Sequence, residues 1–265
     1  MRLGVVLLVL LVATACGVEG TDAGPQAASP SATASAVSSP TPTEAPWQTL
    51  DGPLGRCGPQ PPELGDVAFR YRVLTDPAVG RIPAVTVGSG RTVAVLLHQT
   101  DGNGLCGWLE FAARIARDRR LTALAIDLCQ YGARCRPDRA QTDPVAVAVR
   151  HARQALHADR VVVVGASMGG AVALMSAASL DGVDAAVDLS GPSDWPGVET
   201  VRGGRALQVP VLVAMARDEG PEEVRAARGV VALAPAGSRF EPAATGHGYD
   251  LLQRLGDDVL SWIRG

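Results

Sequence analysis

The chain has 265 residues, a formal net charge of −3 at pH 7 and 47% hydrophobic residues. This slightly acidic balance, without a stripe of basic side chains, argues against nucleic-acid binding. Beyond the N-terminal segment, no apolar run is long enough to cross a membrane, so a membrane-spanning domain is not expected either.

The first residues have the order of an export signal. A charged start, Met1–Arg2, is followed by the apolar run Leu3–Val12, by small residues and by Cys16. A cysteine at this place resembles a bacterial lipoprotein signal. The resemblance implies that residues 1–15 are removed and that Cys16 carries lipid at the outer face of the cytoplasmic membrane. The alternative is an ordinary signal peptide with an incidental cysteine.

The next segment, 16–52, consists mainly of Ala, Ser, Thr, Pro and Gly, with almost no large apolar residues. Such a composition cannot bury enough surface to offset the entropy of ordering, which predicts a disordered tether. Residues 53–265 are enough for one sizeable core and predict a single domain.

Strands and helices alternate along this domain. We expect a half-exposed antiparallel strand at Val67–Leu74, further strands at Ala84–Val87, Thr92–Leu97, Leu121–Asp127, Val161–Val164, Val183–Leu189 and Val209–Met215, and a last strand beginning at Val230–Leu233. Helices are expected at Gly107–Arg119, Pro144–Leu156, Gly170–Leu180, Pro221–Arg228 and Tyr249–Arg264. This alternation predicts an α/β fold with a mostly parallel central sheet and helices on both faces.

The segment Arg160–Gly170, RVVVVGASMGG, stands out in this pattern. A buried strand leads through a sharp turn at Ser167 into a helix, with a glycine two residues before and two residues after the serine. The glycines avoid Cβ clashes in the turn, which lifts the hydroxyl above the carboxyl edge of the sheet. This is the context of a nucleophile elbow.

The chain resembles the α/β-hydrolase superfamily from about Val67 onward. In that family a nucleophile, an acid and a histidine follow in chain order, and Ser167, Asp218 after VLVAMAR, and His247 in ATGHGYD match it. The resemblance implies that Ser167 attacks a carbonyl, His247 moves the proton and Asp218 orients the imidazole. Asp188 and Asp194 are the alternative acids, and Glu219 is expected to point away from His247.

The family also implies an oxyanion hole. One backbone N–H is that of Met168, directly after the nucleophile. The other belongs to the loop after Thr92–Leu97 and is that of Gln99 or Thr100. His98, which precedes them, is interpreted as a structural loop residue.

Four cysteines remain if Cys16 is lipidated, and three pairings of them are open. Cys129 and Cys135 flank a short loop and can meet locally, which leaves Cys57 to pair with Cys106. The spacings are not those of a zinc site, and we expect neither a metal nor a cofactor.

The leading interpretation is a lipid-anchored extracytoplasmic serine hydrolase that cleaves small or surface-presented carboxylic esters. Only about twenty residues separate Leu189 from Val209, too few for a lid domain, which favours an open site. An amide or peptide hydrolase with the same triad is one alternative. A non-catalytic binding lipoprotein is another, and an intact triad argues against it. We expect a monomer.

Overall fold

The computed structural model describes residues 54–65, 67–100, 103–129, 131–202 and 207–265, all of which belong to the compact unit Thr43–Gly265. The predicted signal peptide (1–15), the lipidation site Cys16 and the tether (16–52) lie outside the described residues. Among the residues that are described, no helix combines the length and hydropathy that a bilayer crossing requires.

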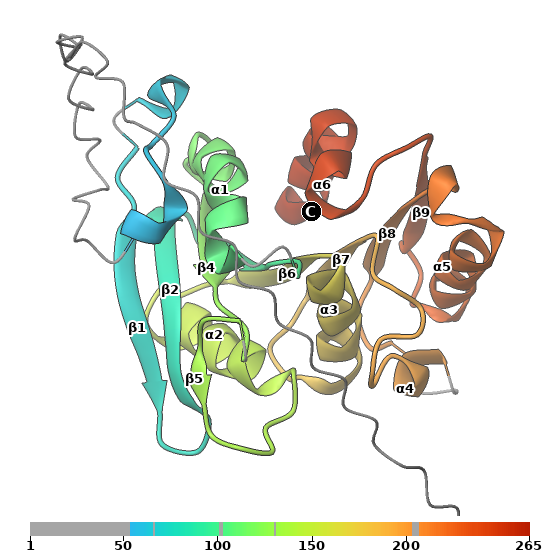
Figure 1. Cartoon of the computed structure of the whole chain (residues 1–265), viewed down its shortest axis with the longest axis horizontal. Coiled ribbons are helices and arrows are strands. Elements are labelled where there is room, and N and C mark those ends of the chain that lie inside the picture. Colours follow the sequence, from blue (N-terminus) through green and yellow to red (C-terminus); the bar gives the residue numbers. More distant parts are fainter. Residues whose placement is uncertain (1–53, 66, 101–102, 130, 203–206) are drawn as a thin grey trace, which may run out of the picture. The chain divides into compact units, whose positions relative to one another are not determined.

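A nine-stranded sheet forms the centre of the domain (Figure 1). Its strands are β1 Arg70–Asp76, β2 Gly80–Gly88, β3 Thr92–Leu97, β4 Leu121–Ile126, β5 Arg134–Cys135, β6 Arg160–Ala166, β7 Ala185–Leu189, β8 Val211–Ala216 and β9 Arg239–Ala243. Their order is β1-β2-β4-β3-β6-β7-β8-β9, and the short β5 pairs with β2. The pairs of β2 with β1, β4 and β5 are antiparallel and the others are parallel. The predicted mostly parallel sheet and the antiparallel first strand are confirmed.

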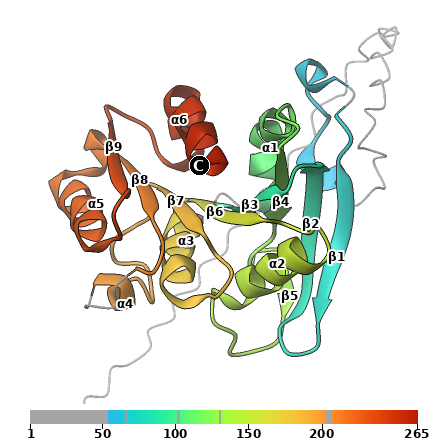
Figure 2. The same cartoon turned by 180° about the vertical axis from the view of Figure 1, so that it is seen from behind.

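Helices cover both faces of this sheet, as Figures 1 and 2 show from opposite sides. They are α1 Leu109–Ala116, α2 Asp143–Gln154, α3 Met168–Ser179, α4 Glu199–Arg202, α5 Pro221–Leu233 and α6 Leu252–Arg264. One buried cluster joins α2, α3 and α5 to one face, and a second joins α1 and α6 to the other. The central strands are therefore buried on both sides, which explains their runs of Val, Leu and Ala.

The last strand differs from the prediction. Residues Val230–Leu233 are not the start of a strand but the final turn of α5. Val224, Ala227 and Val230 recur at helical spacing and pack toward the core, so the valines continue an apolar helix face. The strand is β9, whose Pro242 hides it in the sequence. An edge strand tolerates a proline because its unpaired side needs no N–H.

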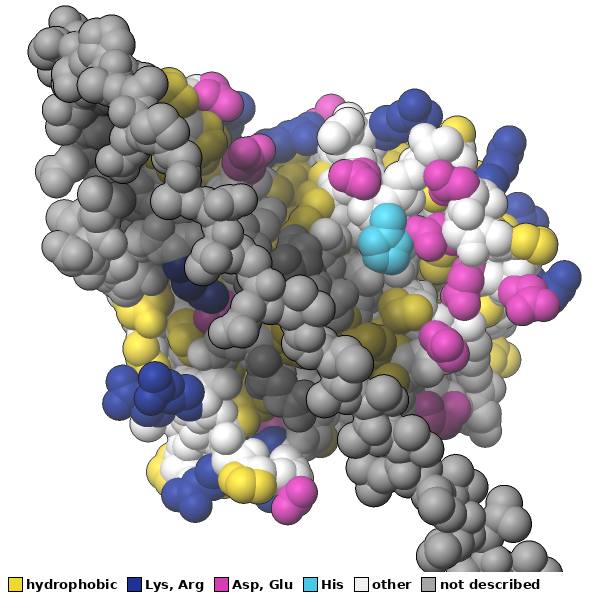
Figure 3. All heavy atoms as spheres, in the orientation of Figure 1, with side chains coloured by type: hydrophobic (Ala, Val, Ile, Leu, Met, Phe, Trp, Pro, Cys, Tyr) yellow, Lys and Arg dark blue, Asp and Glu magenta, His cyan; other side chains and the backbone are white. Residues whose placement is uncertain are grey.

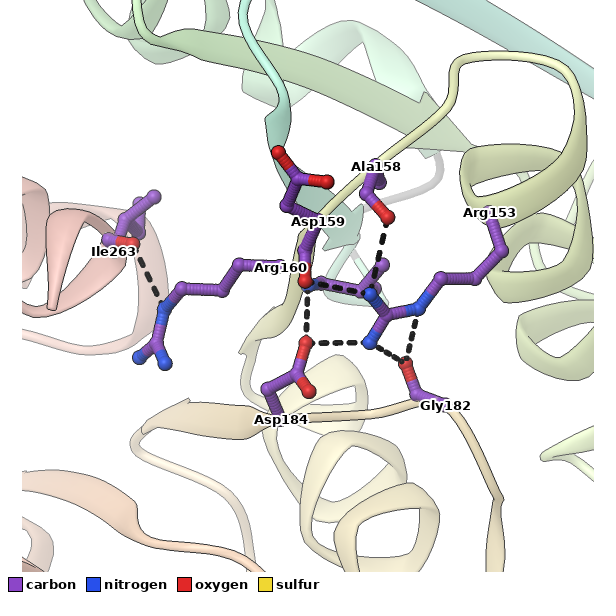
Figure 4. Close-up of polar contacts among 8 residues, drawn as sticks. Arg153, Ala158, Asp159, Arg160, Gly182, Asp184 and Ile263 are labelled. Carbon is purple, nitrogen blue, oxygen red and sulfur yellow. Dashed lines mark hydrogen bonds and ion pairs between the residues drawn. The ribbon is translucent and has the colours of Figure 1, made fainter.

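The amino edge of the sheet is tied together by one arginine. The guanidinium of Arg153 donates to the carbonyl oxygens of Ala158, Asp159 and Gly182 and pairs with the Asp184 carboxylate (Figure 4). The same carboxylate accepts from the backbone N–H of Val161 at 2.6 Å. These contacts fix the starts of β6 and β7, and they leave the opposite, carboxyl edge open for a site.

Both predicted disulfides are present: Cys57–Cys106 and Cys129–Cys135. The first joins the N-terminal segment to the 3-10 helix Gly104–Trp108, and the second closes the loop after β4. The segment between β7 and β8 contains the four-residue helix α4 in its described part, which agrees with the expected lack of a lid domain.

Candidate active site

Ser167 occupies a strained turn between β6 and α3. Its φ of 51° and ψ of −120° lie outside the conformations that a residue with a Cβ normally adopts. The strand position holds it there: the Ser167 N–H donates to the carbonyl of Leu189 at 2.8 Å, and the Ser167 carbonyl accepts from Gly170. The residue is 9% exposed. This strand–turn–helix geometry is that of a nucleophile elbow.

The two glycines around the serine are required by close packing rather than by unusual backbone angles. A Cβ on Gly165 would overlap the carbonyl of Gly169, and a Cβ on Gly169 would overlap the carbonyls of Leu97 and His98. The elbow therefore lies directly against the end of β3 and the loop that follows it. This contact brings the two predicted oxyanion segments together.

His98 fixes the shape of that loop from inside the protein. It is fully buried, and its Nε2 accepts from the N–H of Leu128 at 3.0 Å. Because Nε2 is an acceptor in this contact, Nδ1 carries the proton and donates to the carbonyl of Gln99 at 2.8 Å. The interpretation of His98 as a structural loop residue is confirmed.

The loop that carries His247 packs on the same two segments. A Cβ built on Gly248 would overlap Oε1 of Gln99 and lie 3.5 Å from the Cβ of Ala166. In addition, the Tyr249 N–H donates to Gln99 Oε1, and the Gln99 N–H donates to the Tyr249 hydroxyl, each at 3.3 Å. The histidine loop, the oxyanion loop and the elbow thus meet at the carboxyl edge of the sheet.

The carboxylate at His247 is Glu219. Its Oε1 lies 2.6 Å from Nδ1 of His247, so the expectation that Glu219 points away from the histidine is wrong. Asp218 instead accepts from the N–H of Gly246 at 3.4 Å through Oδ2. Both acids lie in the 3-10 turn Arg217–Glu219, where successive side chains differ by about 120° in direction. The turn aims one of them at the imidazole and the other at the backbone.

The alternative acids from the sequence lie elsewhere. Asp188 is 2% exposed and accepts from the N–H of Gly191 at 2.6 Å, beneath the start of α3. A Cβ on Gly170 would overlap its Oδ1, so the carboxylate packs against the helix rather than the histidine. Asp194 is exposed in the loop after β7. Neither of them is hydrogen-bonded to His247, whose ring partner is Glu219.

Ser167 and His247 lie next to residues that pack together, Ala166 and Gly248, but no hydrogen bond joins them in the described part of the chain. The imidazole is the more accessible of the two, with 47% of its side chain exposed. Catalytic hydrogen bonds are often long or poorly aligned before substrate binds. Figure 3 shows acidic side chains gathered around an exposed histidine, and Asp218, Glu222 and Asp250 are exposed in the segments near His247.

The residues that are predicted to form an oxyanion hole occupy two different environments. Met168 is the first residue of α3 and is buried, so its N–H belongs to the helix N-terminus, which has no intrahelical acceptor and a positive dipole end. Thr100 is exposed at the end of the described part of its loop. Beyond the loop, Leu105 N–H donates to Oδ1 of the buried Asp127, which also pairs with Arg56 at 2.6 Å.

A cavity of about 240 Å³ next to Met168 was not expected from the sequence. Its lining comes from the segment between β4 and α2, from the start of α3 and from the loop after β7: Leu128, Cys129, Tyr131, Arg139, Gln141, Met168, Trp195 and Pro196. No periodicity marks these loop residues. Sequence reasoning also missed Tyr249. The signal that could have found it was its position directly after Gly246–Gly248.

No cluster of His, Cys, Asp and Glu able to hold a metal ion occurs among the described residues. The chemistry that the arrangement supports is that of its own side chains: a hydroxyl at a strained turn, an imidazole bonded to a carboxylate, and backbone N–H groups at a helix N-terminus. These are the parts of nucleophilic acyl transfer.

Comparison with known proteins agrees with the predicted α/β-hydrolase fold. Residues 94–262 match the Alpha/beta hydrolase family. The fold is similar to that of the esterase Pf2001 from Pyrococcus furiosus, at 14% identity over 77% of this chain and 90% of that chain, with a TM-score of 0.59. It is also similar to a dienelactone hydrolase from Anabaena variabilis, at 15% identity over 75% and 97% of the two chains, with a TM-score of 0.56.

A third similar structure is the carboxylesterase CesB from Bacillus subtilis, at 14% identity over 76% of this chain and 92% of that chain, with a TM-score of 0.53. No curated protein sequence matches the chain. At these identities the structures support the fold, while the family match covers more than half of the chain, including the elbow and the histidine loop. The chain therefore belongs to the α/β hydrolase family.

Proposed function

We propose that the protein is a serine hydrolase that cleaves carboxylic esters through an acyl-enzyme at Ser167. The observation that carries this proposal is the φ of 51° at Ser167, a strained conformation at the point where β6 passes into α3. Holding a serine in this conformation costs folding free energy, but it places the hydroxyl at the N-terminus of α3. Two of the similar structures are an esterase and a carboxylesterase, which supports ester hydrolysis.

In this mechanism His247 takes the proton of Ser167 as the hydroxyl attacks the ester carbonyl, and then gives it to the leaving alcohol. A carboxylate on Nδ1 fixes the tautomer that leaves Nε2 as the base, and it stabilises the imidazolium. We assign this role to Glu219, whose contact at 2.6 Å replaces the Asp218 contact expected from the sequence.

The N–H of Met168 and one N–H of the Gln99–Thr100 segment would hold the developing oxyanion. Met168 contributes a helix N-terminal N–H. The Gln99 N–H now donates to the Tyr249 hydroxyl at 3.3 Å, a long bond that the oxyanion would replace. Water then cleaves the acyl-enzyme by the same steps.

A fluorophosphonate probe tests the nucleophile. We expect covalent labelling of the folded wild-type protein and none of Ser167→Ala, with p-nitrophenyl butyrate hydrolysis lost in parallel. Ser89→Ala is the matched control, because Ser89 is an exposed serine in the turn after β2. If the Ser167→Ala protein were labelled and hydrolysed the ester like wild type, the proposal would be wrong.

We further propose that the enzyme works outside the cytoplasm, anchored by lipid on Cys16. The two disulfides support an oxidising compartment. Partitioning into a detergent phase tests the anchor: wild type is expected in the detergent phase and Cys16→Ala in the aqueous phase. Equal partitioning of both proteins would exclude lipid at this residue.

A further inference from the structure

The cavity beside Met168 has an apolar wall and a polar end. Leu128, Tyr131, Met168, Trp195 and Pro196 supply the wall. Arg139 and Gln141, from the segment before α2, supply hydrogen-bond donors. A larger hollow of about 420 Å³ lies at β1, β2 and β5, separated from β6 by β4 and β3 in the sheet. The smaller cavity lies next to the elbow because Met168, which is part of its lining, directly follows Ser167.

The cavity and the histidine approach Ser167 from opposite faces of the sheet. Leu128, Met168 and their neighbours Tyr131 and Trp195 belong to the cluster on the face of α2 and α3. Ala166, Leu251 and Tyr249, beside the histidine loop, belong to the cluster on the face of α1 and α6. Since His247 delivers its proton to the leaving group, the leaving group must lie on its side, and the acyl group extends toward the cavity.

The volume limits the acyl group. The cavity's volume of about 240 Å³ lies below the roughly 300–1,000 Å³ that is typical of ligand pockets. A short chain of a few carbon atoms with a polar terminus fits this space, whereas a long fatty chain exceeds it.

The polar end of the cavity carries a positive charge. Among the described residues that line the cavity, Arg139 is the only charged one. It makes no hydrogen bond with a described residue, and its ion-pair contact is with Asp143, 3.9 Å from Nε. The Gln141 carbonyl oxygen accepts from Nε1 of Trp195 at 2.6 Å, which orients the amide so that its NH₂ group is left as a donor. The described lining thus offers a guanidinium and an amide NH₂ and contains no carboxylate, which makes it complementary to an anion.

We propose that this cavity is the acyl site and that it selects short acyl groups that end in a carboxylate, such as those of half-esters of small dicarboxylic acids. The proposal rests on the proposed ester hydrolysis at Ser167. It adds a specificity determinant, Arg139, and a substrate class.

Two esters of equal acyl length test the selection: monoethyl succinate, which ends in a carboxylate, and ethyl butyrate, which ends in a methyl group. Hydrolysis is followed in a pH-stat. For wild type we expect kcat/KM at least about tenfold higher for monoethyl succinate, as a charge-assisted hydrogen bond would give. Arg139→Gln should reduce the ratio of the two kcat/KM values at least about tenfold.

Arg136→Gln is the matched control, because Arg136 is an exposed arginine three residues away that does not line the cavity. It should leave the ratio unchanged. A wild-type preference for ethyl butyrate, or an equal change of the ratio in both arginine variants, would overturn the proposal.

Calorimetric binding of monoethyl succinate to Ser167→Ala separates this proposal from the proposed function, because it needs no turnover. We expect binding that Arg139→Gln weakens at least about tenfold and Arg136→Gln does not. Arginine-dependent binding without hydrolysis by wild type would refute the ester hydrolase and retain the anion site. Hydrolysis by wild type with binding that is independent of Arg139 would refute the anion site alone.

Discussion

The two halves of the site are built in different ways. The elbow half is held by backbone: β6 lies between β3 and β7, the Ser167 N–H bonds to Leu189, and Gly169 touches the carbonyls of Leu97 and His98. The histidine half lies between the edge strand β9 and α6 and is held by side chains. Its contacts are the Glu219 carboxylate on His247 and the Asp218 carboxylate on the N–H of Gly246.

This difference predicts two kinds of sensitivity. The backbone half is close-packed, so an added methyl group has nowhere to go and affects folding. The side-chain half is exposed, so a substitution there leaves the fold intact and affects the protonation and orientation of the imidazole. Substitutions at the elbow are therefore expected to lower the free energy of unfolding, and substitutions in the histidine loop are expected to lower ester turnover.

The largest expected effect is in the histidine half. Glu219→Gln should lower kcat for ester hydrolysis by up to about 10⁴-fold, by analogy with loss of a triad carboxylate, because the amide no longer enforces the tautomer. Thermal unfolding should be unchanged, since the pair is partly exposed.

Asp218→Asn is the matched control and should lower kcat less than about tenfold, because it loses only the long contact to Gly246. The pH profile of kcat distinguishes orientation of the imidazole from a structural defect. If Asp218→Asn lost activity while Glu219→Gln hydrolysed the ester normally, Asp218 would be the acid that orients His247, as the sequence predicted.

The next largest effect is expected from removal of the disulfide that ties the 3-10 helix Gly104–Trp108 to the N-terminal segment. Cys57 and Cys106 are 49 residues apart, and closing such a loop stabilises by about 4 kcal/mol in the chain-entropy description. The six-residue separation of Cys129 and Cys135 gives about 2 kcal/mol. Urea unfolding of the two double Cys→Ser variants measures both, and the reverse order would contradict this account.

Close packing at the elbow is tested by Gly169→Ala. The added Cβ overlaps the carbonyls of Leu97 and His98, so we expect a loss of about 1–3 kcal/mol in the free energy of unfolding. Gly229→Ala in α5 is the control, because a Cβ there meets nothing within 4 Å. It should stabilise by about 0.5–1 kcal/mol through helix propensity. Equal effects of the two substitutions would show that the elbow glycine is not packed as described.

The smallest expected effect concerns His151, a histidine outside the site. Burial and the neighbouring Arg72 lower the pKa of His151, whose Nε2 lies 3.3 Å from the arginine Nη1. The unfolded chain therefore binds this proton more readily, so stability is full above the unfolded pKa of about 6.5 and falls as the pH drops below it. In thermal unfolding between pH 8 and pH 5, His151→Gln should lose less stability than wild type. An identical pH dependence would contradict the shift.

The sequence alone determined the architecture and predicted the sharp turn at Ser167. Four successive valines before Ser167 are typical of a strand buried on both faces, as in the centre of a parallel sheet, and the glycines two residues either side permit the turn. Local pattern also determined the disulfides, since Cys129 and Cys135 are close in the chain and leave one pair for Cys57 and Cys106. These features depend on a few neighbouring residues, so the sequence is enough to predict them.

Only the tertiary structure decided where adjacent side chains point, where a strand lies in the sheet and which distant segments meet. Asp218 and Glu219 are adjacent in the sequence, and which one faces His247 follows from a single 3-10 turn at the end of β8. The edge strand β9 was hidden by Pro242, because its position in the sheet is what makes a proline acceptable. The cavity likewise combines Arg139 and Trp195, from two loops, with Met168 at the start of α3. Periodicity cannot predict such a contact, because only the packing of distant loops at one sheet edge creates it.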